Sequence, residues 1–140
     1  MWRALLIAAA LAVASCAQLP PSPQEIQAKQ FGSLSDKSVI YVVRSNPDLR
    51  DLPAPLVLDD SGGLTTYPGT FTRWEVAPGK HRIAGLAGDS GHITLNTEPG
   101  RVYYVRQTVS GWRSPSSSLQ LVNEQHGRAV AMRGTLIPVH

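Results

Sequence analysis

Side chains that could perform acid–base or metal chemistry are few and scattered in this sequence. Its histidines include no pair four residues apart and no neighbouring cysteine: His81, His92, His126 and His140. Zinc sites need several nitrogen or sulfur ligands at short spacings, so no metal site is predicted. We expect His81 to be an ordinary histidine on a strand face. Asp59 and Asp60 precede Ser61-Gly62-Gly63, which is typical of a turn, and a calcium loop needs more acids at set spacing.

Nucleophilic catalysis has little support. Ser90-Gly91-His92 and Ser110-Gly111-Trp112 contain serine, but the strained G-x-S-x-G elbow of hydrolases is missing. A serine, histidine and aspartate set can be assembled from Ser90, His92 and Asp89, yet a triad is defined by spatial roles. Phosphate-binding and dinucleotide fingerprints are also missing. We therefore predict a protein that is not an enzyme and that has no cofactor, with a hydrolase as the remote alternative.

Cys16 is the only thiol in the chain, so an intramolecular disulfide is excluded. It follows an unbroken apolar run, Ala4–Ala14, which begins after Arg3. A cationic start, a short apolar core and small residues at the cleavage point are typical of a secretory signal peptide. As a helix the run would reach roughly 16 Å, too short for a bilayer core of about 30 Å. We predict that residues 1–15 are a signal peptide.

The segment Val13-Ala14-Ser15-Cys16 resembles the bacterial lipobox. This resemblance implies that the Cys16 thiol takes a diacylglycerol, that the bond before it is cut, and that the new N-terminus receives an acyl chain such as palmitate. Two or three chains give stable membrane anchoring, whereas one holds only marginally. The following Ala17 is not the aspartate that favours inner-membrane retention. The expected location is therefore the outer membrane, facing the periplasm.

Aromatic side chains are the best candidates for contact with a partner. Trp112 lies in Gly111-Trp112-Arg113-Ser114-Pro115, a predicted loop tip, and Arg113 stands beside it. Tyr103 and Tyr104 must face opposite sides of a strand, so at most one is expected in the core. If Val102 and Tyr104 point inward, Tyr103 is exposed. The alternative for Trp112 is that it folds back over the end of the domain.

These residues must be positioned by short strands between turns. Strand-like segments with β-branched and aromatic residues alternate with glycine- and proline-containing turns: 39–43, 55–58, 65–67, 71–76, 81–86, 92–97, 102–109, 119–122 and 135–139. Pro78-Gly79 and Pro99-Gly100 predict tight hairpins, with a positive φ at Gly79. Residues 123–132 could form a short helix capped by Asn123, weakened by Gly127. The pattern predicts a small antiparallel β-sandwich.

Three segments are expected along the chain. The signal peptide, residues 1–15, is followed by a lipidated N-terminus and a proline-rich tether over 16–37, in which 24–31 could hold one or two helical turns. The β-sandwich domain then covers 38–140. The formal net charge is +3, and no basic stripe indicates nucleic-acid binding.

Several segments in this order resemble a family of small bacterial lipoproteins that carry domain of unknown function 2846. They are AKQF (28–31), VIYVVR (39–44), EVAPGKHRI (75–83), PGRVYYVRQ (99–107) and LQLVNEQHGR (119–128). The resemblance implies a β-sandwich at the cell envelope and no particular chemistry. The chain departs from the family at Leu56–Gly63, where a YLDGK turn is usual. It departs again at 132–134, where a late cysteine is common.

Two function classes remain open. The first is a membrane-anchored, non-catalytic envelope module that contacts a partner through Trp112, Arg113 and Tyr103. The partner would be an envelope protein or a glycan, in addition to the membrane that holds the lipid anchor. The second is a structural or assembly lipoprotein with no ligand.

Overall fold

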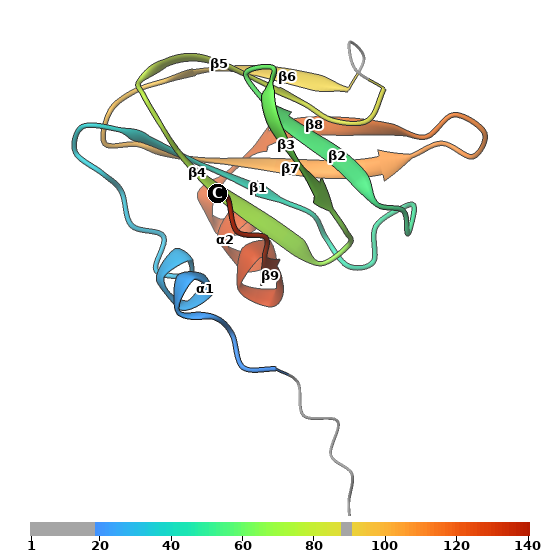
Figure 1. Ribbon diagram of the computed structural model, residues 1–140, viewed down its shortest axis with the longest axis horizontal. Coiled ribbons are helices and arrows are strands. Elements are labelled where there is room, and N and C mark those ends of the chain that lie inside the picture. The colour runs from blue at the N-terminus through green and yellow to red at the C-terminus, as the bar shows by residue number, and fades with distance from the viewer. Residues whose placement is uncertain (1–18, 88–90) are drawn as a thin grey trace, which may run out of the picture.

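The computed structural model of the protein describes residues 19–87 and 91–140. The described chain is mainly β, with a short helix near the C-terminus, as the sequence predicts (Figure 1). Its elements are, in order, α1 (Pro23–Ala28), β1 (Ser38–Val43), β2 (Ala54–Leu58), β3 (Ser61–Thr66), β4 (Thr70–Val76), β5 (Gly79–Ala84), β6 (His92–Thr97), β7 (Val102–Ser110), β8 (Ser116–Val122), α2 (Glu124–Arg133) and β9 (Thr135–Leu136).

The strands form two sheets. One has the order β8-β7-β1-β4-β9 and the other the order β3-β2-β5-β6. Most neighbours are antiparallel, but β1 pairs with β7 in parallel, and β4 pairs with β9 in parallel. The predicted small antiparallel β-sandwich is thus confirmed, with two parallel strand pairs within the five-stranded sheet. Between β1 and β7 the chain crosses to the second sheet twice, for β2 and β3 and, after β4, for β5 and β6. The adjacent strands β1 and β7 run in the same direction, so they end at the same end of the sandwich.

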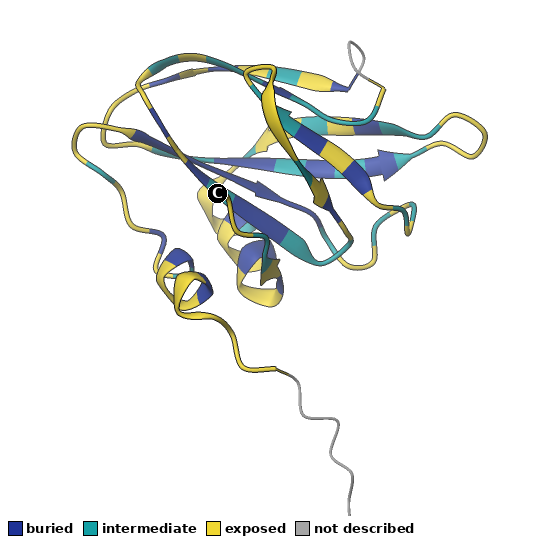
Figure 2. Cartoon of the chain, viewed as in Figure 1, coloured by how far each residue is buried: buried dark blue, intermediate teal, exposed yellow. Residues whose placement is uncertain are grey.

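The five-stranded sheet is covered on both faces. Helices α1 and α2 lie on one face and the four-stranded sheet lies on the other (Figure 1). Along β1, Val39, Tyr41 and Val43 belong to the helix-side core, whereas Ile40 and Val42 belong to the core between the sheets. All six residues of β1 are buried (Figure 2). This explains why its sequence is continuously apolar rather than alternating.

The double covering overturns one expectation about the adjacent tyrosines. Tyr104 is buried in the helix-side core, and Tyr103, on the opposite face of β7, packs against the core between the sheets. The Tyr103 hydroxyl accepts a hydrogen bond from the Glu98 N–H at 2.8 Å. Tyr104 is therefore a buried core residue and Tyr103 is half-buried against the other core, so the expectation that Tyr103 is exposed is wrong. Burial raises the pKa of the Tyr104 hydroxyl.

The tether ends earlier than the expected range 16–37, because the folded domain already begins with α1. Ser22 caps α1 by accepting a hydrogen bond from the Glu25 N–H at 3.1 Å. Ala28 and Phe31 are buried in the helix-side core, and the Tyr41 hydroxyl donates to the Ala28 carbonyl at 2.7 Å. Apolar residues at these positions dock the segment on the sheet, so the folded domain includes α1.

The C-terminal helix forms where the sequence predicts it. The Asn123 side chain accepts a hydrogen bond from the His126 N–H at 2.8 Å, which is the expected N-cap. Gly127 faces the sheet, and a Cβ there would lie 2.5 Å from Cδ1 of Tyr104. The glycine that weakens the helix in isolation therefore lets it approach the sheet closely.

The predicted turns are also present, although the turn expected over 59–63 is confined to Asp59 and Asp60, because β3 begins at Ser61. Gly79 and Gly100, each the second residue of a Pro-Gly pair, have φ of 135° and 77°. Asp59 and Asp60 turn the chain between β2 and β3 with φ of 52° and 56°, values that aspartate tolerates better than most residues. Both Pro-Gly turns lie at the end of the sandwich where β1 and β7 begin, since Val39 pairs with both Val102 and Glu75.

Candidate functional site: the tip of the sandwich

The opposite end of the sandwich presents an exposed aromatic side chain. The β7–β8 hairpin remains paired up to Ser110 and Ser116, and residues 111–115 form its tip. Trp112 in this tip is 83% exposed and Arg113 is exposed. The alternative in which Trp112 folds back over the domain is therefore not the arrangement seen. Tyr103 lies near the start of β7, about seven strand residues or roughly 23 Å from the tip, so the structure does not bring it to the other two.

A second loop joins the hairpin at this end. Residues 44–53 connect β1 to β2, and Leu49 in this loop is 74% exposed. The neighbouring Arg50 donates through Nη1 to the carbonyl oxygens of Gly111 at 2.7 Å and Trp112 at 3.4 Å. We call the surface formed by Leu49, Arg50, Trp112 and Arg113 the tip patch. Sequence reasoning missed Leu49 and Arg50, because only the parallel pairing of β1 with β7 places their loop beside the hairpin.

The Trp112 ring is held rather than free. The Arg50 guanidinium lies over it, 4.6 Å from the ring centre, within the range of a cation–π interaction. Because the same guanidinium bonds the hairpin carbonyls, it fixes the ring and its backbone together. A large aromatic surface thus remains exposed in a defined position, with little rotamer freedom left to lose on binding.

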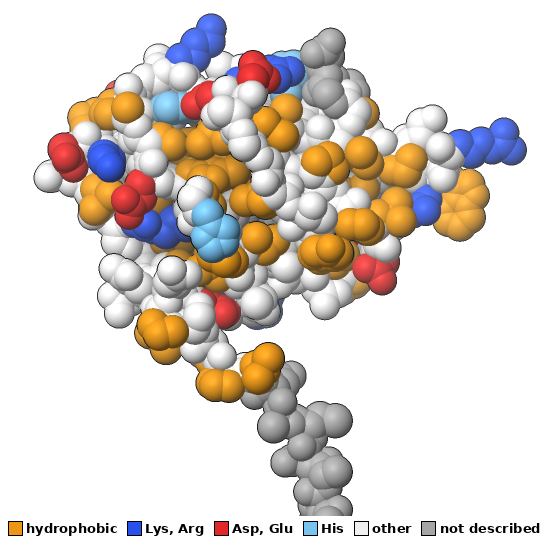
Figure 3. All heavy atoms as spheres, in the orientation of Figure 1, with side chains coloured by type: hydrophobic (Ala, Val, Ile, Leu, Met, Phe, Trp, Pro, Cys, Tyr) orange, Lys and Arg blue, Asp and Glu red, His pale blue; other side chains and the backbone are white. Residues whose placement is uncertain are grey.

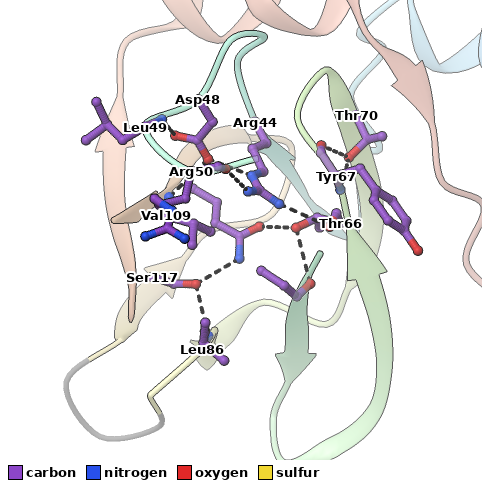
Figure 4. Close-up of polar contacts among 12 residues, drawn as sticks. Arg44, Asp48, Leu49, Arg50, Thr66, Tyr67, Thr70, Leu86, Val109 and Ser117 are labelled. Carbon is purple, nitrogen blue, oxygen red and sulfur yellow. Dashed lines mark hydrogen bonds and ion pairs between the residues drawn. The ribbon is translucent and has the colours of Figure 1, made fainter. Parts of the chain in front are cut away.

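A buried ion pair supports the second loop. Arg44 is 1% exposed and donates through Nε to Asp48 Oδ2 at 2.6 Å. Its remaining donors reach the carbonyls of Thr66 at 3.1 Å and Arg50 at 2.9 Å. Asp48 also accepts from the N–H groups of Leu49 and Val109, at 2.7 and 3.0 Å (Figure 4). The pair therefore fixes the backbone on both sides of the tip patch.

The network continues between the sheets beneath the tip. The Thr66 hydroxyl donates to Gln107 Oε1 at 2.7 Å, and Gln107 Nε2 donates to Ser117 Oγ at 3.1 Å. Ser117 Oγ in turn accepts from the Leu86 N–H at 2.9 Å (Figure 4). Buried polar groups that are satisfied in this way make the arrangement specific. Beneath the tip patch, these hydrogen bonds therefore connect strands of both sheets.

The tip carries a small positive charge. Arg50 and Arg113 are opposed there by the exposed Asp51, whereas Asp48 is neutralised by Arg44. The loops 44–53 and 111–115 thus hold three cations and two anions, a net charge of +1. Hydrophobic and basic side chains lie together at the end of the β7–β8 hairpin, which projects from the body of the domain (Figure 3). The chemistry of the patch is apolar and cationic.

His81, on β5, is the histidine with the clearest environment. Nδ1 lies 2.6 Å from Asp59 Oδ2, and Nε2 lies 2.6 Å from the Ala77 carbonyl oxygen. Partial burial disfavours the cation, but the hydrogen bonds to Asp59 and Ala77 outweigh it and raise the pKa of His81. Burial likewise opposes ionisation of Asp59, but His81 and the Arg82 N–H lower its pKa. An ionised Asp59 carboxylate and the Ala77 carbonyl are both acceptors, so this geometry favours the protonated ring, and His81 joins the turn after β2 to the turn after β4.

A groove opens between the sheets on the side where β3 and β4 diverge. It has a volume of about 520 Å³ and its apolar wall contains Leu56, Leu58, Leu64, Trp74, Pro138 and Val139. Asp59 and His140 lie at its rim. Ser61 also lines the groove, and its hydroxyl donates to the Leu58 carbonyl at 3.4 Å.

The remaining sequence predictions concern other parts of the chain. Cys16 and the signal peptide lie outside the described residues, and so do Asp89 and Ser90. Across residues 19–87 and 91–140 no group of three or more histidine, cysteine, aspartate or glutamate side chains could hold a metal ion. No helix in the described part of the chain has the length and apolar character needed to cross a bilayer.

Comparison with known proteins leaves the geometry as the main guide to function. No model of a protein family matches the chain, and no curated protein matches it.

Proposed function

We propose that the protein is a lipid-anchored envelope lipoprotein that acts as a non-catalytic contact module, with the tip patch as its contact surface. The observation that carries the proposal is Trp112, which is 83% exposed yet held by Arg50. Exposed tryptophans that are already ordered are common among the residues that dominate binding energies.

The anchor part of the proposal rests on the sequence around Cys16. A short apolar core, small residues and a sole cysteine together suit lipidation, and the resemblance to small envelope lipoproteins points to the same location, the outer membrane facing the periplasm. Ser22, the N-cap of α1, follows Cys16 by six residues, a stretch that spans at most roughly 20 Å. The anchor would therefore hold the folded domain close to the membrane surface.

The non-catalytic part rests on how the polar side chains are used. His81 is engaged at both ring nitrogens, and the Arg44–Asp48 pair is consumed by structural hydrogen bonds. Polar groups with perturbed pKa values usually mark active sites when they line a cleft. Asp59 lies at the rim of the groove between the sheets, but its carboxylate bonds the His81 ring and the Arg82 N–H, which favours a structural explanation of the two pKa shifts.

The anchor is tested by replacing Cys16 with serine in the producing cell. We expect the unmodified chain to leave the membrane fraction, and mass spectrometry of the native protein to show a cleaved, acylated N-terminus at Cys16. An intact leader with a bare thiol on the native protein would overturn the anchor.

The contact surface is tested separately by in-cell photo-cross-linking from position 112, with Lys80 at the far end of the sandwich as the control position. We expect a discrete product from 112 and none from 80. Equal labelling from both positions, or none from either, would instead favour the alternative of a structural lipoprotein without a ligand.

A further inference from the structure

We propose that the tip patch docks on an anionic phospholipid bilayer, with Leu49 and Trp112 entering the headgroup region and Arg113 facing lipid phosphates. This inference rests on the proposed role of the tip as the contact surface and names its partner. It does not depend on which leaflet carries the Cys16 anchor.

The shape of the patch favours a fluid partner over a rigid one. Leu49 and Trp112 are 74% and 83% exposed; Trp112 lies at the end of the projecting β7–β8 hairpin, and Leu49 lies in the β1–β2 loop, which Arg50 bonds to it (Figure 1). A stable protein interface buries about 800 Å² per partner over a broad, complementary surface. A narrow convex tip meets that requirement poorly against a flat protein. A bilayer, in contrast, deforms around inserted side chains.

The side-chain types suit a membrane interface. Tryptophan is enriched at the headgroup level, where its ring is apolar and its indole N–H remains hydrated. Leu49, on the other loop, adds a purely aliphatic side chain. Its transfer from water into a bilayer is favourable, and it has no polar group that could form a hydrogen bond to a sugar. The Arg50 bonds to the Gly111 and Trp112 carbonyls keep the two loops together, so both apolar groups can enter one surface at once.

The charge selects anionic lipid. The tip has a net charge of +1, and Arg113 is an exposed cation beside the ring. A basic residue near an anionic bilayer contributes about fivefold to binding, and the contribution is screened by salt. Asp51, also exposed, opposes this attraction. Its charge therefore provides a test in which a substitution should strengthen binding.

The tether keeps the tip near a bilayer. A folded domain of about 120 residues has a radius of gyration near 14 Å, and the chain between Cys16 and Ser22 spans at most roughly 20 Å. A tip on a domain held this closely experiences a high effective concentration of lipid. Weak insertion of two side chains is then sufficient to orient the domain.

The first experiment measures contact between Trp112 and lipid directly. The acylated protein, cleaved before Cys16, and its Trp112→Phe variant are reconstituted into vesicles of phosphatidylcholine alone or with phosphatidylglycerol, with and without bromine on the acyl chains. Bromine on the acyl carbons next to the headgroups quenches a tryptophan at the headgroup–acyl boundary, and the difference between the two proteins isolates Trp112 from Trp74, the other tryptophan of the chain after cleavage before Cys16. We expect quenching of Trp112 that increases with phosphatidylglycerol. Quenching of wild type and variant to the same extent would overturn the proposal.

The second experiment uses charge. In the phosphatidylglycerol vesicles, Arg113→Gln should lower the ratio of inserted to free tip about fivefold, and Asp51→Asn should raise it by a similar factor. Lys80→Gln makes the same charge change as Arg113→Gln at the opposite end of the sandwich and should have no effect. If Lys80→Gln and Arg113→Gln have equal effects, the attraction belongs to the whole molecule, and the tip proposal fails.

The outcomes separate this inference from the proposed function. A protein that does not float with vesicles at all contradicts the lipid anchor. A protein that floats but shows no Trp112 quenching retains the anchor and contradicts lipid docking. In that case, a discrete in-cell product from position 112 would assign the tip patch to a protein or glycan partner instead.

Discussion

Arg44 Nε and Asp48 Oδ2 lie 2.6 Å apart, and neither side chain is more than 4% exposed. The two residues join the end of β1 to the loop that carries Leu49 and Arg50. A buried ion pair of this kind contributes little net stability over an apolar pair, but removal of one partner leaves an uncompensated charge. Its evident role is to give the loop one conformation.

Replacement of Asp48 by alanine should therefore destabilise the domain strongly, by about 3–5 kcal/mol. Arg44 would lose its carboxylate, and the N–H groups of Leu49 and Val109 would lose their acceptor. Urea unfolding measures the change. Asp51→Ala is the matched control, since this exposed acid should shift stability by no more than about 0.5 kcal/mol. Equal effects of the two substitutions would contradict the assigned role of Asp48.

Replacement of Trp112 by alanine should leave the melting temperature nearly unchanged, because the ring is 83% exposed. Loss of its cation–π contact with Arg50 removes about 0.5–1 kcal/mol at most. Trp74, which is 7% exposed in the core between the sheets, is the comparison. Trp74→Ala should reduce the free energy of unfolding by about 3–5 kcal/mol. Thermal melts of both variants measure the contrast, and a large loss for Trp112 would make it a packing residue.

Replacement of Gly127 by alanine should destabilise the protein, although alanine favours a helix over glycine by about 1 kcal/mol. The new Cβ would lie 2.5 Å from Cδ1 and Cγ of Tyr104, which forces α2 off the sheet and costs typically about 1–3 kcal/mol. Ala129→Gly, at an exposed position of the same helix, provides the helix-propensity reference. Chemical unfolding would report both changes, and a more stable Gly127→Ala protein would contradict the close packing.

The contact between His81 and Asp59 should make stability depend on pH. The pKa of His81 is raised in the folded protein, so its contribution is fully present below the ordinary pKa of about 6.5 and is lost as pH rises through the folded value. The pKa of Asp59 is lowered, so its contribution is lost as pH falls below about 4. As pH rises from 5 to 9, the free energy of unfolding, measured in urea, should fall more for wild type than for His81→Asn. Parallel pH profiles would refute a charged His81.

Much of the fold follows from local sequence. Alternating and β-branched segments predict the strands, and Pro78-Gly79 and Pro99-Gly100 predict hairpins because only glycine adopts their positive φ easily. Asn123 predicts the start of α2 because its side chain satisfies a free backbone N–H. The loop position of Trp112 follows likewise from the glycine and proline residues around it, whereas its exposure is decided only by the structure.

The covering of the five-stranded sheet could not be predicted in this way. The sequence Tyr103-Tyr104 shows that the two rings face opposite sides of a strand, but it does not show that α2 covers one side and the second sheet the other. Residues 24–31 have weak helical periodicity, and their place in the core depends on Phe31 meeting Tyr41 and Tyr104 from distant strands. Such contacts depend on topology rather than on local pattern.

The sequence by itself determined the strands, their turns and the chemistry of the predicted anchor, because these depend on neighbouring residues and on the intrinsic preferences of each side chain. Only the tertiary structure decided that Arg50 meets Trp112, that Asp48 is buried against Arg44, and that Tyr103 is removed from the tip. The physical reason is that the parallel pairing of β1 with β7 brings together loops more than fifty residues apart. Long-range pairing of this kind depends on the burial of apolar surface over the whole domain, and no single segment of the sequence contains that information.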